Sequence, residues 1–193
     1  MKVFLQMRAW QLFLVLVGAH FLMYATTIAV GHSAGGSRVL LVAIATAMPV
    51  PVAIFIAWFW ALGTNTNQKV LEGIRPSPRL FRFALSYPFA YAVVFWMLSV
   101  LLSLLHASVG LYRVSPPFQL LAGLCLLYAL YFIAKNFVMA ERKEQVGFYD
   151  FAGPFFLILL YPIGVWFIQP RVNSMFQDRP SRPAEAGEPR GRS

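Results

Sequence analysis

Four long apolar runs, separated by short polar segments, dominate the pattern of hydrophobic and polar positions along the chain. Each run exceeds the roughly 18 apolar residues that a membrane-crossing helix needs. Because backbone N–H and C=O groups find no water in lipid, such runs satisfy them internally as helices. The sequence therefore predicts an all-α integral membrane protein, a bundle with transmembrane helices at about 10–30, 39–62, 83–105 and 118–137.

A fifth apolar run, 151–168, is shorter and contains Pro154, Pro162 and Gly164. Proline removes a backbone hydrogen bond and clashes with the preceding helical turn, and glycine can adopt a positive φ. This C-terminal membrane-embedded segment therefore has two interpretations. It either spans the membrane as a helix with tolerated prolines, or it is re-entrant, with a turn at 162–164 that returns the chain to the same side.

Basic residues lie mainly in alternate gaps between the runs, and cationic side chains are retained on the cytoplasmic side of a membrane. Lys2 and Arg8 place the N-terminus in the cytoplasm, on the same side as the basic segments 63–82 and 138–150. The connections 31–38 and 106–117 carry one arginine each and lie outside. This distribution predicts a multi-pass protein of a cell inner membrane with a cytoplasmic N-terminus.

The C-terminal arginines help to distinguish a spanning fifth run from a re-entrant one. If the fifth run spans the membrane, these arginines lie outside, and the excess of basic residues on the cytoplasmic side nearly vanishes. If the run is re-entrant, they stay inside and the excess is kept, so the distribution of basic residues favours re-entry. These residues are Arg171, Arg179, Arg182, Arg190 and Arg192. Beyond residue 176 the chain is rich in proline and charge and has little apolar surface to bury. We therefore predict a single helix bundle over 1–176 and a disordered tail over 177–193.

Composition narrows the class of protein further. Of the 193 residues, 59% are hydrophobic and 12% are charged, about half the charged fraction of an average soluble domain. The net charge of +9 is explained by topology and by anionic lipid headgroups, so the lipid bilayer is the predicted partner and nucleic acid is not. Cys125 is the sole cysteine, which excludes a disulfide framework or a thiolate metal site.

Gly31–Gly35 reads GHSAG and matches the G-x-S-x-G nucleophile motif. That motif functions at a strand-to-helix turn, with an acid and a histidine beside the serine. Here it falls in a short outer connection that offers no carboxylate, although His32 and His106 could approach each other there. We interpret the match as a coincidence of small residues.

His20 lies near the middle of the first run. A proton relay normally includes intramembrane carboxylates, and bis-histidine haem ligation needs a second buried histidine. The sequence predicts no intramembrane carboxylate and no second buried histidine. We therefore interpret His20 as a neutral imidazole hydrogen-bonded to a neighbouring helix. No catalytic, cofactor-binding or metal-binding residue, and no cofactor, is predicted.

Several other residues fit ordinary membrane-helix packing. Pro49, Pro51 and Pro88 are predicted to kink their helices, and Ser99 and Ser103 to permit close helix contact. The segments 63–82 and 138–150 could together form a cytoplasmic docking face, whose second part includes Glu141, Arg142, Lys143, Glu144 and Asp150. Four tryptophans near run ends are predicted to be interfacial anchors: Trp10, Trp58, Trp60 and Trp166.

A resemblance is carried by WFWALGTNTNQKV, taken with the inner loop and the third apolar run that follow it, and then by YFIAKNFVMAERKEQVGFYDFAGPFFLILLYPIGVWFIQPRVN. They make the second half of the chain similar to a group of small, uncharacterised multi-pass bacterial membrane proteins. The most specific part is the element FF-x5-P-x-G-x-W-F-I-Q-P-R. The resemblance implies a bacterial inner membrane and no particular activity. The matching residues are Phe155, Phe156, Pro162, Gly164, Trp166, Gln169, Pro170 and Arg171.

These patterns favour a non-catalytic subunit or scaffold of a membrane assembly, with a membrane-protein partner or as a homo-oligomer. One alternative is a small oligomeric transporter or channel, which a polar stripe facing a pore would distinguish. A further alternative is a membrane enzyme acting on lipid, with the acids and arginines of the inner loops as its site.

Overall fold

The computed structural model describes residues 3–33, 49–105 and 115–176, and these residues form helices and connections with no strand. Four helices are long and apolar enough to cross a membrane: α2 (Ala9–Ser33), α4 (Pro49–Lys69), α5 (Arg79–Leu104) and α7 (Pro116–Arg142). The predicted all-α bundle with four candidate spans is thereby confirmed. The predicted disordered tail, the first part of the second apolar run and most of the two short outer connections lie outside the described residues.

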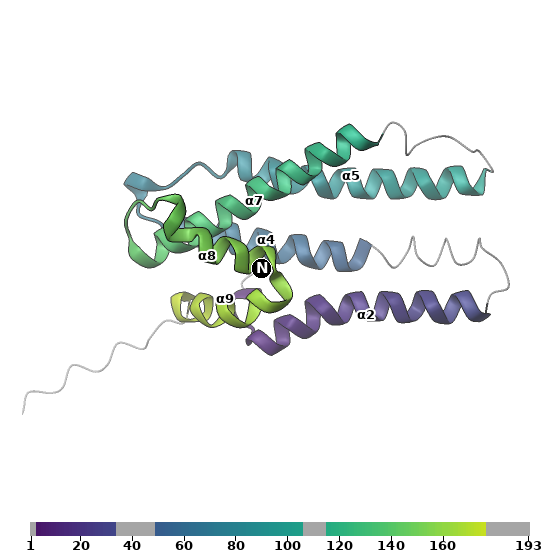
Figure 1. Ribbon diagram of the computed structural model, residues 1–193, viewed down its shortest axis with the longest axis horizontal. Coiled ribbons are helices and arrows are strands. Elements are labelled where there is room, and N and C mark those ends of the chain that lie inside the picture. Colours follow the sequence, from purple (N-terminus) through teal and green to yellow (C-terminus); the bar gives the residue numbers. More distant parts are fainter. Residues whose placement is uncertain (1–2, 34–48, 106–114, 177–193) are drawn as a thin grey trace, which may run out of the picture.

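The four long helices run side by side with alternating direction (Figure 1). Helix α7 contacts both α4 and α5, and α4 also contacts α2. The connection between α4 and α5, which contains the short 3-10 helix η1 (Glu72–Ile74), lies at the same end of the bundle as the connection that follows α7 (Figure 1). We call this end the basic end, because Lys69, Arg75, Arg79 and Arg142 lie in or beside these connections.

The hydrophobic core lies in the half of the bundle nearest the basic end. Trp58, Phe59, Phe81 and Phe137 are among its largest fully buried side chains. In contrast, α2 and α5 bury few side chains over the candidate spans. Large apolar residues therefore face outward along both helices, as expected of surfaces in contact with lipid or with a further membrane helix.

Two helix ends extend further than the sequence predicted. Helix α4 continues through GTNTNQK to Lys69, so the prediction of a loop from Gly63 is wrong. This polar end stays helical because it packs into the protein: Thr66 and Asn67 are buried, and Asn67 bonds Asn136 of α7. The hydroxyls are paired within the helix, since Thr64 donates to Trp60 O (2.5 Å) and Thr66 donates to Leu62 O (2.6 Å). Helix α7 similarly ends at Arg142, beyond the predicted residue 137.

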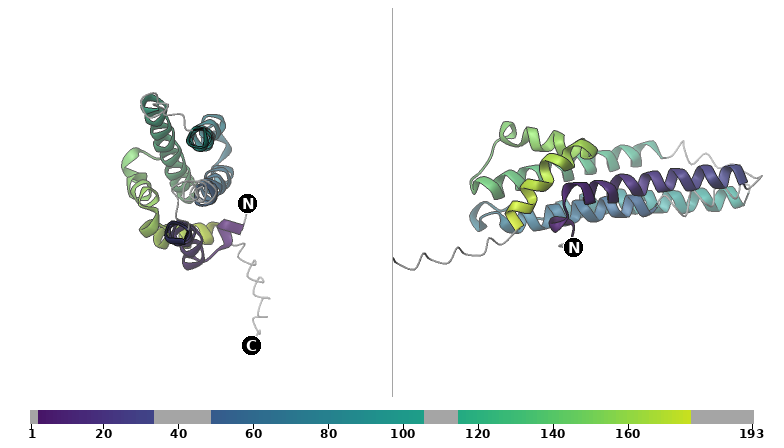
Figure 2. Two further views of the ribbon diagram at one scale, coloured as in Figure 1. Left: turned by 90° about the vertical axis from the view of Figure 1, so that its right-hand side faces the viewer. Right: turned by 90° about the horizontal axis from the view of Figure 1, so that it is seen from below.

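The fifth apolar run forms two helices, α8 (Phe148–Leu159) and α9 (Tyr161–Phe176), which break at Leu160. Helix α8 leaves the basic end, and α9 turns back toward it (Figures 1 and 2). At 12 and 16 residues, the helices are about 18 and 24 Å long, shorter than the roughly 30 Å hydrocarbon core. We call α8 and α9 the C-terminal hairpin.

The predicted turn at 162–164 is displaced, because the break falls at Leu160 and Pro162 lies in the first turn of α9. Proline is tolerated there, since first-turn N–H groups have no carbonyl one turn earlier to bond. Gly164 is helical and its N–H donates to Leu160 O (2.9 Å). An ideal Cβ on Gly164 would lie 1.6 Å from Leu157 O. Glycine therefore permits the close approach of α9 to α8.

Candidate functional site

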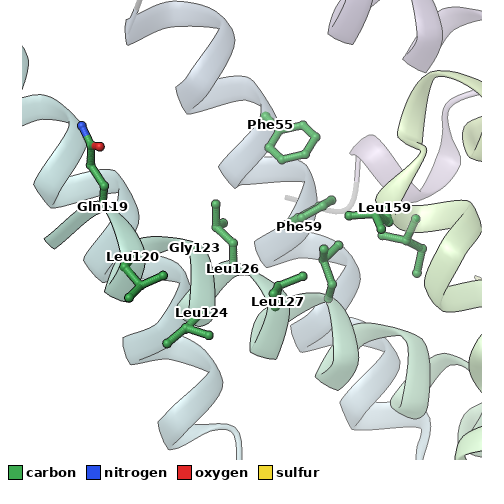
Figure 3. A pocket seen from close by; sticks show the side chains of 11 residues that line it. Phe55, Phe59, Gln119, Leu120, Gly123, Leu124, Leu126, Leu127 and Leu159 are labelled. Carbon is green, nitrogen blue, oxygen red and sulfur yellow. The ribbon is translucent and has the colours of Figure 1, made fainter. Parts of the chain in front are cut away.

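An apolar cleft opens between α4, α7 and α8 (Figure 3). Its volume is about 510 Å³, within the usual range of roughly 300–1,000 Å³ for ligand pockets. Gln119 is its single polar residue and lies at the end nearest the start of α7. The lining residues are Phe55 and Phe59 of α4, Gln119, Leu120, Gly123, Leu124, Leu126, Leu127 and Leu130 of α7, and Ile158 and Leu159 of α8.

Gly123 leaves open space along this cleft. A Cβ built on Gly123 meets no atom within 4 Å, so helix packing does not require glycine there. The missing side chain instead widens the cleft between Leu120 and Leu127, which lie about one turn away on either side. A surface lined in this way can bind hydrocarbon by burial and dispersion contacts, and it offers no group for acid–base or nucleophilic chemistry.

At the basic end, a buried amide pair links α4 to α7. Asn67 Nδ2 donates to Asn136 Oδ1 (3.1 Å) and to Pro76 O (3.0 Å), which also holds the connection after α4. Asn136 Nδ2 donates to Phe132 O (2.7 Å). Both side chains are almost completely buried, so their hydrogen bonds avoid the desolvation cost of unpaired amides.

Gln169 joins α9 to α1 (Val3–Gln6), the short N-terminal helix. Its Nε2 donates to Phe4 O (2.7 Å) and Met7 O (3.0 Å), and it lies 3.1 Å from Asn173 Oδ1. Asn173 Nδ2 donates to Met7 O as well (3.0 Å). The carbonyls at a helix end lack intrahelical partners, and these two amides supply hydrogen bonds to Phe4 O of α1 and to Met7 O just after it.

Two ion pairs fasten the C-terminal hairpin to the end of α7. Arg171 bonds both carboxylate oxygens of Glu141 and lies over the Phe137 ring, 4.9 Å from its centroid. Arg142 contacts Asp150 at 2.7 Å. The Gly147 N–H donates to Asp150 Oδ2 (2.9 Å), and this bond, together with the one from Arg142, lowers the pKa of Asp150.

The predicted docking face is thus partly occupied by internal contacts. Glu141, Arg142 and Asp150 hold the hairpin, and Arg75 donates to Val70 O and Gln68 O at the end of α4. Lys143 ends α7 in the left-handed region at φ 58°, which the sequence did not indicate. Tyr149, by contrast, is 95% exposed at the start of α8.

The structure separates the residues that were considered as candidates for chemistry. Gly31–Ser33 form the last turn of α2, whereas Ala34, Gly35 and His106 lie outside the described residues. His20 is half-buried, and its Nδ1 lies 2.7 Å from Leu16 O. The predicted partner on a neighbouring helix is therefore replaced by a carbonyl of the same helix. Within the described ranges, no group of three or more His, Cys, Asp or Glu is placed to hold a metal ion.

The predicted interfacial tryptophans have mixed outcomes. Trp10 and Trp166 are each 48% exposed, but Trp58 is 1% exposed and belongs to the core, so its predicted interfacial role is wrong. Trp58 is buried because it lies a turn and a half before the polar end of α4, on the side that faces the core. Pro88 lies inside α5, and Ser99 donates to Phe95 O (2.7 Å) of its own helix.

Sequence reasoning missed the cleft and the pairing of the buried amides. The C-terminal motif did contain Gly164, Gln169 and Arg171, and each now has a contact that explains it. Comparisons with protein-family models, curated proteins and solved structures found no match to this chain.

Proposed function

We propose that the chain is a multi-pass membrane protein that acts as a non-catalytic subunit or scaffold of a membrane assembly. The observation that carries this proposal is a ridge of exposed apolar side chains on α5. Val94, Met97 and Leu101 are 63%, 69% and 52% exposed and follow the i, i+3, i+7 spacing of one helix face. A second membrane helix can pack against such a ridge. We call these three residues the α5 ridge.

The proposed setting is a bacterial inner membrane with a cytoplasmic N-terminus. Two observations support it: the resemblance carried by the C-terminal motif, and the gathering of basic residues at one end of the bundle. Cationic residues are retained in the cytoplasm, so the basic end is the cytoplasmic end in this proposal. The C-terminal hairpin is then re-entrant from the cytoplasmic side.

Purification in a mild detergent tests the subunit role. A stoichiometric partner is expected with the wild-type chain, and Met97→Trp on the α5 ridge is expected to lose it because the larger side chain prevents close packing. Leu22→Trp is the matched control, since Leu22 is 67% exposed on α2. A monomer without a partner, or equal retention by both variants, would count against the proposal. The two alternative functions, a small oligomeric transporter or channel and a membrane enzyme acting on lipid, remain predictions from the sequence.

A further inference from the structure

We propose that the apolar cleft between α4, α7 and α8 holds the acyl chains of one membrane lipid from the leaflet opposite the basic end. This inference rests on the membrane location proposed above and is independent of the partner on the α5 ridge. It follows from the dimensions of the cleft, its position relative to the C-terminal hairpin and the lack of a side chain at Gly123.

The width of the cleft selects its occupant. Its α7 lining runs from Gln119 to Leu130, which is about 16 Å of helix at 1.5 Å per residue. Dividing the volume of about 510 Å³ by this length gives a mean cross-section of about 30 Å². A helix about 10 Å across needs roughly 80 Å², whereas carbon chains that approach to about 4 Å need roughly 15 Å² each. A cleft of this cross-section has room for alkyl chains lying along α7 and is too narrow to enclose a whole helix.

The length and position of the cleft fit one leaflet. About 16 Å is close to half of the roughly 30 Å hydrocarbon core. The C-terminal hairpin covers α7 only from the basic end to the break at Leu160, and Ile158 and Leu159 close the cleft at that point. The remaining length of α7 toward Gln119 is left open to the opposite leaflet. Gln119 lies at the far end, where its amide can donate a hydrogen bond to a lipid ester carbonyl.

Gly123 provides a direct test of occupancy. Gly123→Leu extends a side chain into the cleft from a position where no atom lies within 4 Å of the Cβ. The replacement also favours helix by about 1 kcal/mol, so the variant is expected to fold. Gly18→Leu is the matched control, since Gly18 lies on α2 and also has nothing within 4 Å of its Cβ position.

Native mass spectrometry after extended detergent washing measures the retained lipid. We expect one phospholipid mass per chain for the wild type and for Gly18→Leu, and at least a fivefold lower occupancy for Gly123→Leu. Adding phosphatidylglycerol to delipidated protein is expected to raise the melting temperature of the wild type and of Gly18→Leu, because a ligand that binds the folded state stabilises it. Gly123→Leu is expected to show little rise.

Three results would overturn the inference: no lipid on the wild type, equal lipid on both leucine variants, or a second polypeptide in place of lipid. These failures are distinct from failure of the proposed membrane location. A chain that remains in the soluble fraction of lysed cells would contradict the membrane location itself, whereas a membrane-extracted chain without lipid contradicts only the assignment of the cleft.

Discussion

At the scale of single residues, Gly164 shows how a small side chain fixes the geometry of the C-terminal hairpin. Its backbone comes so close to Leu157 that any larger residue meets the carbonyl oxygen. The sequence indicated that Gly164 matters but assigned it to a turn. A glycine can be needed for a positive φ or for close contact between helices. Which of the two applies depends on where the second helix lies, and the sequence pattern does not contain that information.

We predict that Gly164→Ala destabilises the chain by about 1–3 kcal/mol, the usual cost of overpacking, because the backbone of α8 must move to admit the methyl group. Gly153→Ala, in the same hairpin, has nothing within 4 Å of its Cβ position. It is expected to stabilise by about 0.5–1 kcal/mol through helix propensity. Thermal unfolding in detergent measures both, and similar melting temperatures for the two variants would refute the close-approach explanation.

At the scale of elements, the start of α8 depends on one carboxylate. Asp150 accepts a hydrogen bond from the Gly147 N–H at the helix N-terminus and contacts Arg142 at the end of α7. A carboxylate in this position satisfies an unpaired N–H and interacts favourably with the helix dipole. Asp150 thereby couples the beginning of the hairpin to the end of the preceding long helix.

The lowered pKa of Asp150 predicts how this link responds to pH. Because its pKa in the folded state lies below the usual 3.8, the stabilisation is present above that value and is lost as the pH falls through the folded-state pKa. Wild type is expected to melt above Asp150→Asn at about pH 6, and the difference is expected to shrink toward about pH 3. Melting curves across this range provide the measurement, and a difference independent of pH would contradict the assignment.

At the scale of the whole molecule, the sequence predicted the four long helices because their apolar runs are long and nearly free of charge. It placed the end of α4 too early, since a run of polar residues gives no sign that Thr66 and Asn67 are buried or that Asn67 bonds Asn136 of α7. The cleft was not predictable either, because its opening at Gly123 depends on where the hairpin stops. The amide contacts of Gln169 join residues that no local pattern pairs.

The hairpin predicts that both of its ends face the same side of the membrane. Glu144 precedes α8, and Ser174 lies in the last turn of α9; both are exposed. In a Cys125→Ala background, Glu144→Cys and Ser174→Cys are expected to react with a membrane-impermeant maleimide only after cells are permeabilised. If Ser174→Cys reacts in intact cells while Glu144→Cys does not, the segment 151–168 spans the membrane.

The bond between Gln169 and the Phe4 carbonyl also constrains the order of biosynthesis. Its partners are 165 residues apart, so the N-terminal helix acquires this contact only once the chain has been translated as far as α9. At roughly 5–20 residues per second, that interval is about 8–33 s. During it, the carbonyls at the end of α1 depend on water or lipid headgroups for hydrogen bonds. The N-terminal helix therefore completes this contact only after α9 has been made.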